Sequence, residues 1–318
     1  MTKSISQLKP EKPLGVGLFL PNEEEHLALI TELIDKDADF FELSPEVLWL
    51  GSSSGGKIDN HPSLDLFLQI RDFIQKPFVA HGLALSLGTP LTTSNERHRT
   101  TAWLEKMAEM HQLFNFQYYT EHLGFTNSSD GHFAILPLPL PYNDEAVNTV
   151  AERLNLMQEI VPLVGFENSV FYFTMGNPMD EAEFYNRICA KAQSGMLLDL
   201  HNVYSHCLNF DLDPYEFLDR IELDNVIQIH LSGGSESETD WLPSKKVMRL
   251  DSHDDDIPEE VIDLFKYVLP KCDNLRGVLV ERLNGTLDEN NIDRFKAEFR
   301  MVKSIYAEYF LKAEIQHS

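Results

Sequence analysis

Eight short apolar segments, each with the length and composition of a buried β-strand, constrain the fold of this 318-residue chain more than any other feature. Some are nearly continuous apolar runs, such as 195–200 and 225–231, which is typical of strands that are covered on both faces. The predicted strands are residues 14–20, 38–43, 77–82, 115–121, 162–170, 196–200, 226–231 and 277–281.

Amphipathic helical patterns alternate with these strands. Asn22 is a candidate N-cap for the first helix, and Ser94 or Asn95 for a long helix that reaches Phe114. A chain of this length could hold two ordinary domains, but eight strand–helix repeats predict an α/β fold with one closed (β/α)8 TIM barrel, a single domain over 1–318. The other helices are predicted to begin near Asp144, Asp180, Asp213, Pro258 and Asp288, with a weaker one over 63–75 and the barrel core at about 14–310.

Side chains that can bind metal ions occur near the ends of most of these strands and in one loop. The carboxyl ends of the strands carry the active site in a (β/α)8 barrel, so we expect these side chains to meet at one mouth. Imidazole and carboxylate bind iron, manganese and zinc, and amide oxygens are weaker ligands. The candidates are His81, Glu121, His122, Glu167, Asn168, Asp199, His201, Asn202, His230, Asp251, His253 and Glu281.

Each candidate has a structural alternative when it is considered alone. Glu281, for example, could pair with Arg282, and a single histidine after a strand is more often a core residue than a ligand. A buried acid such as Glu167, however, must find a cation or several donors. One zinc ion needs three or four protein ligands, so the larger set predicts two or three metal ions with bridging carboxylates.

The charge and the cysteine content limit the class of protein. There are 51 acidic and 26 basic residues, and the resulting net charge of −25 argues against nucleic acid as a partner, although an acidic surface that only aids solubility would look the same. The three cysteines have neither paired spacing nor a CxxC motif. Residues 1–13 lack the apolar core of a signal peptide, and no run of about 18 apolar residues occurs, so we expect a cytoplasmic protein without a membrane partner.

Two predicted loops, 122–143 and 232–256, are long for barrel connections. Long loops at the catalytic mouth of a barrel often bind substrate or form a lid, and simple decoration is the alternative.

Taken together, several motifs resemble the multinuclear non-haem iron-dependent oxidases, a family that includes the oxidase of methanobactin biosynthesis. No single motif is specific, but they follow the family's order and span nearly the whole chain. The motifs are HisGlyLeuAlaLeuSerLeuGly (81–88), GluHisLeuGlyPhe (121–125), ProLeuProLeuProTyr (137–142), GluAsnSer (167–169), LeuLeuAspLeuHisAsnValTyr (197–204), IleHisLeuSerGly (229–233), AspSerHis (251–253) and ValGluArg (280–282).

The resemblance implies a xylose-isomerase-like barrel, related to that of endonuclease IV, with two or three iron ions in mixed Fe2+ and Fe3+ states. It implies O2-dependent modification of cysteine, or less often another residue, in a ribosomally made precursor peptide that a separate partner protein delivers. Asp199, His230 and Glu121 are the expected catalytic residues, Glu121 as a bridging or supporting carboxylate. The implied metal ligands are His81, His122, Glu167, Asn168, Asp199, Asn202, His230, Asp251, His253 and Glu281.

The chain departs from the family pattern at three positions. Ser44 stands where the family has the histidine of a His-x-Glu-Asn stretch, while Glu46 is retained. This change could weaken or remove one metal site. Ser169 replaces the usual proline, and His201, where the family often has asparagine, could supply a replacement ligand.

Three alternatives remain open: an endonuclease IV-like hydrolase of abasic DNA, a sugar isomerase of the same barrel superfamily, and a non-catalytic metal-binding scaffold in a modification complex. The acidic charge argues against the hydrolase. The isomerase would need a catalytic lysine or histidine beside the sugar and would work without O2, and loss of metal through Ser44 would favour the scaffold. Oxygen uptake in the presence of peptide separates the oxidase from all three.

Overall fold

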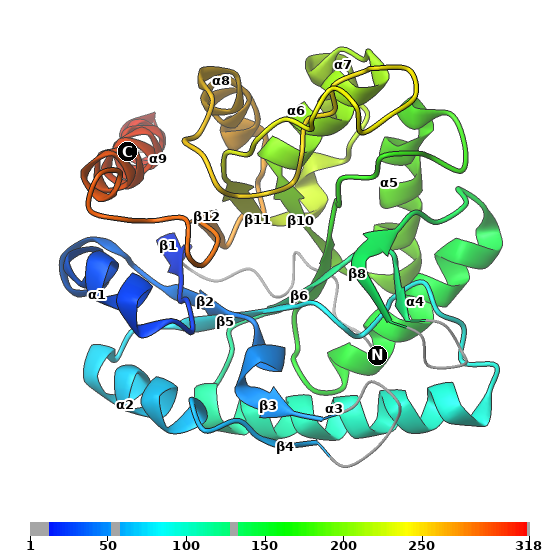
Figure 1. Ribbon diagram of the computed structural model, residues 1–318, viewed down its shortest axis with the longest axis horizontal. Helices are drawn as coiled ribbons and strands as arrows, with labels where there is room; N and C mark the ends of the chain where they lie inside the picture. The colour runs from blue at the N-terminus through cyan, green and yellow to red at the C-terminus, as the bar shows by residue number, and fades with distance from the viewer. Residues whose placement is uncertain (1–12, 52–57, 128–132, 317–318) are drawn as a thin grey trace. The chain divides into compact units, whose positions relative to one another are not determined.

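A computed structural model describes residues 13–51, 58–127 and 133–316 of the chain (Figure 1). The prediction that residues 1–13 hold no signal peptide therefore lies outside the described residues, apart from Pro13. No helix of the described ranges has both the length and the apolar character needed to cross a bilayer.

Eight strands of the described chain close into a barrel in the order β1-β12-β11-β10-β9-β6-β5-β2, which confirms the predicted (β/α)8 fold. All eight predicted strands are present, and each lies within about four residues of its expected bounds because the apolar runs extend past the hydrogen-bonded segments. The strands are β1 (Gly15–Phe19), β2 (Phe41–Leu43), β5 (Phe78–Gly82), β6 (Tyr119–His122), β9 (Val164–Glu167), β10 (Gly195–Asp199), β11 (Val226–Leu231) and β12 (Gly277–Val280).

The register of the parallel strands determines which side chains share the carboxyl edge. His122 at the end of β6 lies opposite Glu167 at the end of β9. Glu167 in turn lies opposite Leu197 of β10, two residues before Asp199. Because the strands are parallel, polar residues that end neighbouring strands are brought to one edge by the backbone itself.

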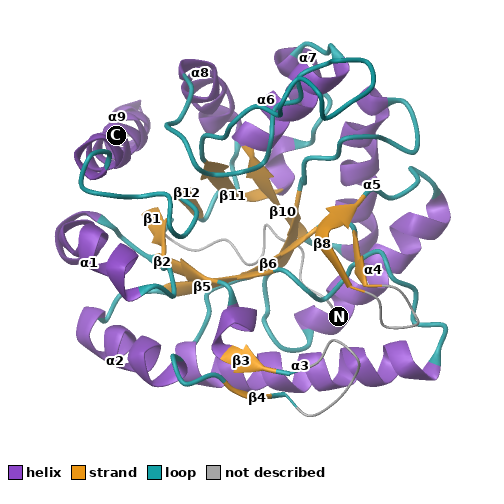
Figure 2. Ribbon diagram, in the orientation of Figure 1, coloured by secondary structure: helices purple, strands orange, loops and turns teal. Residues whose placement is uncertain are grey.

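Helices connect the strands as the alternating pattern predicts (Figure 2). Two short antiparallel hairpins interrupt this plan: β3 (Trp49–Leu50) with β4 (Asp59–Asn60), and β7 (Phe125–Asn127) with β8 (Phe133–Leu138). The second hairpin lies in the segment that the sequence predicts as the long loop 122–143. The helices are α1 (Glu24–Glu32), α2 (Leu64–Ile74), α3 (Ser94–Phe114), α4 (Asp144–Gln158), α5 (Glu181–Ala192), α6 (Leu200–Phe210), α7 (Pro214–Asp219), α8 (Glu259–Val268) and α9 (Ile292–Gln316).

Three local predictions are wrong. The N-cap of α1 is Glu23 rather than Asn22, and the N-cap of α3 is Thr93, whose side chain accepts a hydrogen bond from the backbone N–H of Glu96. Thr93, Ser94 and Asn95 are all good caps, so only the backbone conformation decides between them. Helix α6 is absent from the prediction because it follows β10 without a loop, and the Asp199 side chain that ends the strand caps the helix.

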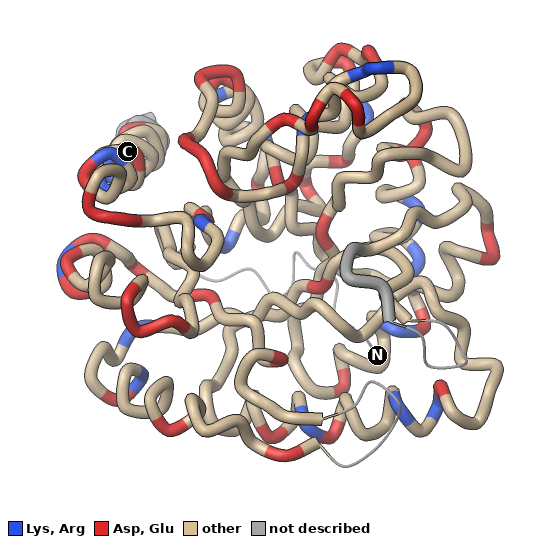
Figure 3. Tube along the Cα trace, in the orientation of Figure 1, with Lys and Arg blue, Asp and Glu red and all other residues tan. Residues whose placement is uncertain are grey.

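The described residues form two compact units, Glu42–Leu197 and a second unit that combines 13–41 with 198–316. Strands β2 and β10 each carry the chain from one unit to the other. In the first unit α4 packs against α5 and β9, and in the second α6 packs against α7, α8 and β11. Acidic residues occur on many helices and loops of each unit (Figure 3).

A network of buried charged side chains stabilises the first unit beside the loop that follows β5. The carboxylate of Glu96 on α3 accepts hydrogen bonds from Arg99 at 2.7 Å and from Arg153 of α4. Arg99 also donates to the carbonyl of Leu85, and Arg153 to the carbonyl of Thr89 at 2.6 Å. The network therefore fixes the loop that begins after β5, the strand that carries His81.

Replacing Arg153 with methionine is expected to lower the free energy of unfolding by about 3 kcal/mol, because a nearly buried carboxylate and carbonyl lose a charged partner. Urea denaturation measures this change. Asp144→Asn, which breaks the exposed pair between Asp144 and Arg187, is the matched control and should leave the midpoint unchanged. Equal stability of the two variants would show that the buried network is not stabilising.

Candidate metal centre

Three side chains form the first cluster, which lies entirely in the first unit. His81 comes from β5, His122 from the end of β6 and Glu167 from the end of β9. The Nε2 atoms of the two histidines lie 3.3 Å and 2.9 Å from the same oxygen, Oε2 of Glu167. His81 and Glu167 are buried, and His122 is partly exposed. One ligand atom from each residue lies within 4.8 Å of the others.

The histidines set the electrostatics of this cluster. Burial alone would raise the pKa of Glu167, but His122 and His81 outweigh it and hold that pKa well below its ordinary value. The Nδ1 atom of His81 lies 2.9 Å from Oγ1 of Thr120, which fixes the orientation of the ring. The second ring nitrogen of a metal-binding histidine commonly makes such a contact.

Two neighbouring acids lie in the same unit, with Glu121 fully buried and Glu46 half-buried. Burial and the nearby Glu46 raise the pKa of Glu121 to about 8, and Tyr119 donates a hydrogen bond to it. Burial also raises the pKa of Glu46, whose carboxylate accepts hydrogen bonds from the backbone N–H groups of Leu83 and Ala84 at 2.9 and 3.1 Å. In a protein without metal, Glu121 thus holds a proton near neutral pH, and the nearby Glu46 favours that protonated form.

Glycine is required beside these acids. A Cβ atom at Gly82 would lie 1.9 Å from the hydroxyl of Tyr119 and 2.4 Å from Oε2 of Glu121. The absence of a side chain on Gly82 lets the strand approach the Tyr119–Glu121 pair closely.

The second cluster lies entirely in the second unit and contains Asp199, His230, Asp251, His253 and Glu281. Ligand atoms of Asp199, His253 and Glu281 lie within 4.8 Å of one another. Nδ1 of His230 is 3.0 Å from one oxygen of Glu281, and Nδ1 of His253 is 3.2 Å from the other. Nε2 of His253 lies 2.5 Å from Oδ1 of Asp251. The Glu281 carboxylate thus contacts the imidazoles of both His230 and His253.

The charges of the second cluster strongly perturb its titration. Burial would raise the pKa of Glu281, but His253 and His230 hold it well below its ordinary value. Burial would lower the pKa of His253, but Glu281 and Asp251 outweigh burial and raise it well above 6.5. When no metal is bound, His253 therefore keeps its proton to a higher pH than an ordinary histidine does.

Binding of Zn2+ to the metal-free protein should release this proton, because a metal-bound imidazole nitrogen must be deprotonated. The raised pKa of His253 means that the proton competes at neutral pH and that competition fades as the pH rises through this pKa. We expect apparent affinity to rise by up to about tenfold per pH unit as the pH approaches the raised pKa of His253 from below. Calorimetry in two buffers with different ionisation enthalpies measures the proton release; an affinity that is constant with pH would contradict the assignment.

The donor set of both clusters fits a metal ion. Bonds of about 2.0–2.2 Å to a shared ion place two ligand atoms at most roughly 4.4 Å apart. The spread within 4.8 Å exceeds that limit by only a few tenths of an ångström. Imidazole nitrogen and carboxylate oxygen without thiolate suit iron, manganese and zinc.

The remaining predicted ligands are placed less directly. Asn168 is buried directly after β9, and Asn202 is buried in the first turn of α6, where its backbone N–H donates to Oδ1 of Asp199 at 2.7 Å. Their ligand roles stay predictions. His201 turns to Arg249, whose Nε donates to its Nε2 at 3.4 Å. Ser44 is buried and occupies the N-cap position of the short 3-10 helix η3 (Pro45–Leu48), where its side chain makes no capping hydrogen bond.

Two side chains that interact with Glu121 in the first unit, Glu46 and Tyr119, are not among the residues predicted from the sequence. Glu46 is noted as retained but is absent from the predicted ligands, since it lies in η3 and not at a strand end. Tyr119 looks like a core residue of β6. One available signal is that Tyr119 and Glu121 lie two residues apart on a strand and so share a face.

The closed strand order defines a (β/α)8 barrel, and each of its two units carries one candidate metal cluster. Over residues 14–307 the sequence matches the family described as RiPP precursor modification enzyme MbnB/TglH/ChrH, where RiPP denotes a ribosomally synthesised and post-translationally modified peptide. The chain belongs to this family, which confirms the resemblance in the motifs.

Two sequence relatives agree with this membership. The chain is 32% identical to a UPF0276 protein of Acinetobacter baylyi over 270 residues, 85% of this chain and 84% of the relative. It is 32% identical to a UPF0276 protein of Shewanella sediminis over 275 residues, 84% and 86% of the two chains.

Two solved barrels resemble the fold. A xylose isomerase domain containing protein from Salmonella typhimurium has a TM-score of 0.54 at 14% identity, over 92% of this chain and 98% of that one. Endonuclease IV from Thermus thermophilus has a TM-score of 0.50 at 17% identity, over 90% and 99%. At these identities the likeness shows the fold alone.

Proposed function

We propose that this protein is a multinuclear iron-dependent oxidase that uses O2 to modify a cysteine of a ribosomally made precursor peptide. Family membership supports a role in precursor modification. The observation that carries the iron centre is the pair of clusters, each with three ligand atoms within 4.8 Å, in a donor set of imidazole and carboxylate. We also propose that residues 1–318 act as one functional domain in the cytoplasm.

The proposal gives each cluster a metal-binding role. His81, His122 and Glu167 would hold one iron, and Asp199, His253 and Glu281 another. His230 and Asp251 would complete the second set, because each contacts one of its members. Asn168 and Asn202 are proposed as weaker ligands. Ser44, which replaces a histidine of the family pattern, favours two irons over three.

Bound iron would supply thiolate ligation and the reduction of O2. The protein would supply orientation and proton control around it. Glu121, with a pKa of about 8 in the metal-free protein, can hold or release a proton near neutral pH, and the Tyr119 hydroxyl orients it. A separate partner protein is proposed to deliver the peptide.

Metal analysis of anaerobically purified protein, with Mössbauer spectra of an iron-57 sample, tests the centre first. Two or more irons per chain with coupled ferric and ferrous signals would support the oxidase. Zinc or magnesium alone, with iron refused on reconstitution, would favour the hydrolase or isomerase alternatives.

Oxygen uptake then tests the reaction. The substrate is a cysteine-containing peptide encoded beside the gene, added with any co-encoded partner protein. Uptake should require both iron and the peptide cysteine, and a cysteine-to-serine peptide is the matched control. Iron-loaded protein that consumes no O2 with the cysteine peptide would favour the scaffold alternative.

A further inference from the structure

Hydrogen bonds fix the backbone of Arg249, although the loop that carries it has no helix or strand. The segment from β11 to α8 contains no helix and only isolated bridges, one of which pairs Arg249 with Glu236 (Figure 2). Asn209 of α6 holds both backbone groups of Arg249: its Oδ1 accepts the N–H at 2.8 Å, and its Nδ2 donates to the carbonyl at 3.0 Å. The loop therefore presents this side chain from a fixed backbone.

The guanidinium group of Arg249 also contacts two side chains, His201 and Tyr204. Its Nε donates to Nε2 of the buried His201 at 3.4 Å, and its central carbon lies 5.7 Å from the centre of the Tyr204 ring. A histidine nitrogen that accepts an N–H is unprotonated, so His201 orients Arg249 without repelling it. A Cβ at Gly234 would lie 2.7 Å from the His201 ring, so the glycine leaves room for this arrangement.

The positive charge of Arg249 has no carboxylate within 4.0 Å in the described ranges of the chain. Its two terminal nitrogens make no hydrogen bond there and are not buried. Other arginines of the second unit differ: Arg294 contacts Asp256 at 2.7 Å, and Arg300 contacts Asp37 at 2.9 Å. In a chain with a net charge of −25, an oriented arginine without an acidic partner is a candidate anion site.

Arg249 lies close to the second cluster. The ring of His201, which holds it, is 6.5 Å from the ring of His253 between centres. One imidazole thus separates the guanidinium from a proposed metal ligand. A peptide residue spans at most about 3.5 Å, so a peptide bound at the second cluster could place a group two to four residues away on Arg249.

We propose that Arg249 binds a carboxylate of the peptide substrate and so selects which residue reaches the second cluster. The planar guanidinium offers its two free terminal nitrogens to both oxygens of one carboxylate. His201, Tyr204 and Asn209 act as positioning residues. This inference rests on the proposed function for its choice of a peptide as the ligand and for the metal-binding role of the second cluster.

Calorimetry with short synthetic peptides tests the inference on metal-loaded protein. The probes are acetyl-Cys-Gly-Gly-Gly with a free carboxyl terminus, the same peptide as its amide, and acetyl-Cys-Gly-Glu-Gly amide. At least one carboxylate peptide should bind about 10- to 100-fold more tightly than the neutral amide. The two acidic probes distinguish a terminal carboxylate from a side-chain carboxylate.

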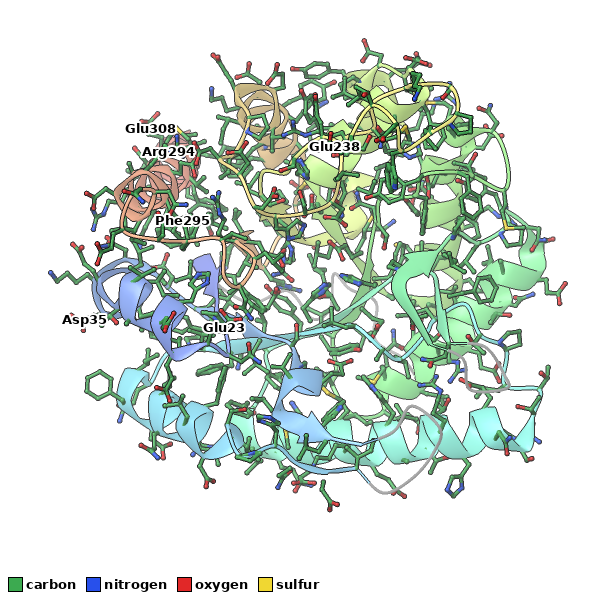
Figure 4. All side chains as sticks on the ribbon, viewed as in Figure 1. Glu23, Asp35, Glu238, Arg294, Phe295 and Glu308 are labelled. Atoms are coloured by element: carbon green, nitrogen blue, oxygen red, sulfur yellow. The ribbon has the colours of Figure 1, made fainter. Side chains whose placement is uncertain are left out.

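Arg249→Gln should abolish this preference while the affinity for the neutral amide and the metal content stay unchanged. Arg249→Lys should retain only part of the preference, because it keeps the charge but loses the planar fork. Arg294→Gln, at an exposed position labelled on α9 in Figure 4, is the matched control and should keep the full preference. Equal binding of acid and amide by the native protein, or a preference that survives in Arg249→Gln, would overturn the inference.

Serine versions of the peptides separate this inference from the proposed function. If serine and cysteine peptides bind equally but the carboxylate preference depends on Arg249, thiol ligation fails and the anion site stands. If the cysteine peptides bind more tightly than their serine versions but show no carboxylate preference, the anion site fails and the oxidase proposal stands.

Discussion

Glu167→Gln is expected to empty the first cluster of metal and to lower the rate of peptide modification by more than about 100-fold. The Glu167 carboxylate contacts both His81 and His122. A glutamine has nearly the same shape, but it lacks the negative charge that draws a cation and the two imidazoles together. Loss of a group that only supports a ligand already lowers metal affinity 10- to 100-fold as a rough guide, so loss of a shared ligand should have a larger effect.

Elemental analysis and the modification rate, measured on the same preparation, test this result. Glu183→Gln changes an exposed glutamate of α5 in the same way and should retain metal and activity. A Glu167→Gln protein with its full metal complement would remove Glu167 from the proposed ligands. The second cluster should stay loaded, so the variant should keep part of the metal of the native protein.

Asp199→Asn is expected to remove metal from the second cluster without loss of the fold. The side chain of Asp199 has two tasks: it belongs to the cluster with His253 and Glu281, and its Oδ1 accepts the N–H of Asn202 at the start of α6. Asparagine is as good an N-cap as aspartate, so the helix should keep its first turn. The lost charge should reduce activity by more than about 100-fold, by the same reasoning as for Glu167.

Asp199→Ala separates the two tasks. It should lose metal as Asp199→Asn does and should also lose about 1 kcal/mol of stability through the missing cap. Asp213→Asn is the control for Asp199→Asn and should retain both the fold and the metal. Asp213 caps α7 by accepting the N–H groups of Tyr215 and Glu216, and it is not a member of either cluster. Circular dichroism and thermal unfolding report the helix, and metal content reports the cluster. If Asp199→Asn retains both metal and activity, the site assignment is wrong.

The barrel and the core of each cluster were predictable because one physical rule governs both. Strands covered on two faces are apolar along their length, so a charged residue at the end of such a strand is conspicuous. His122 and Glu167 meet because β6 and β9 are parallel and in register. The sequence therefore predicted which side chains gather without any knowledge of distances.

The remaining features depend on contacts that no local pattern encodes. Glu46 lies in a short 3-10 helix, and its position depends on the backbone N–H groups of Leu83 and Ala84. Arg249 is oriented by His201 and Asn209, which lie 48 and 40 residues earlier in the chain. A search for polar residues at the ends of buried strands cannot find such residues, because their contacts come from distant segments of the chain.

The corner where β10 becomes α6 has a consequence for ion selectivity. Asp199 cannot move away to admit a larger ion without loosening the hydrogen bond that begins α6. An ion that demands longer bonds would therefore distort a helix terminus, whereas one that accepts the existing spacing would leave it intact. Slower amide hydrogen exchange in the first turn of α6 would then accompany the ions that fit, so that the helix itself discriminates between metals by radius.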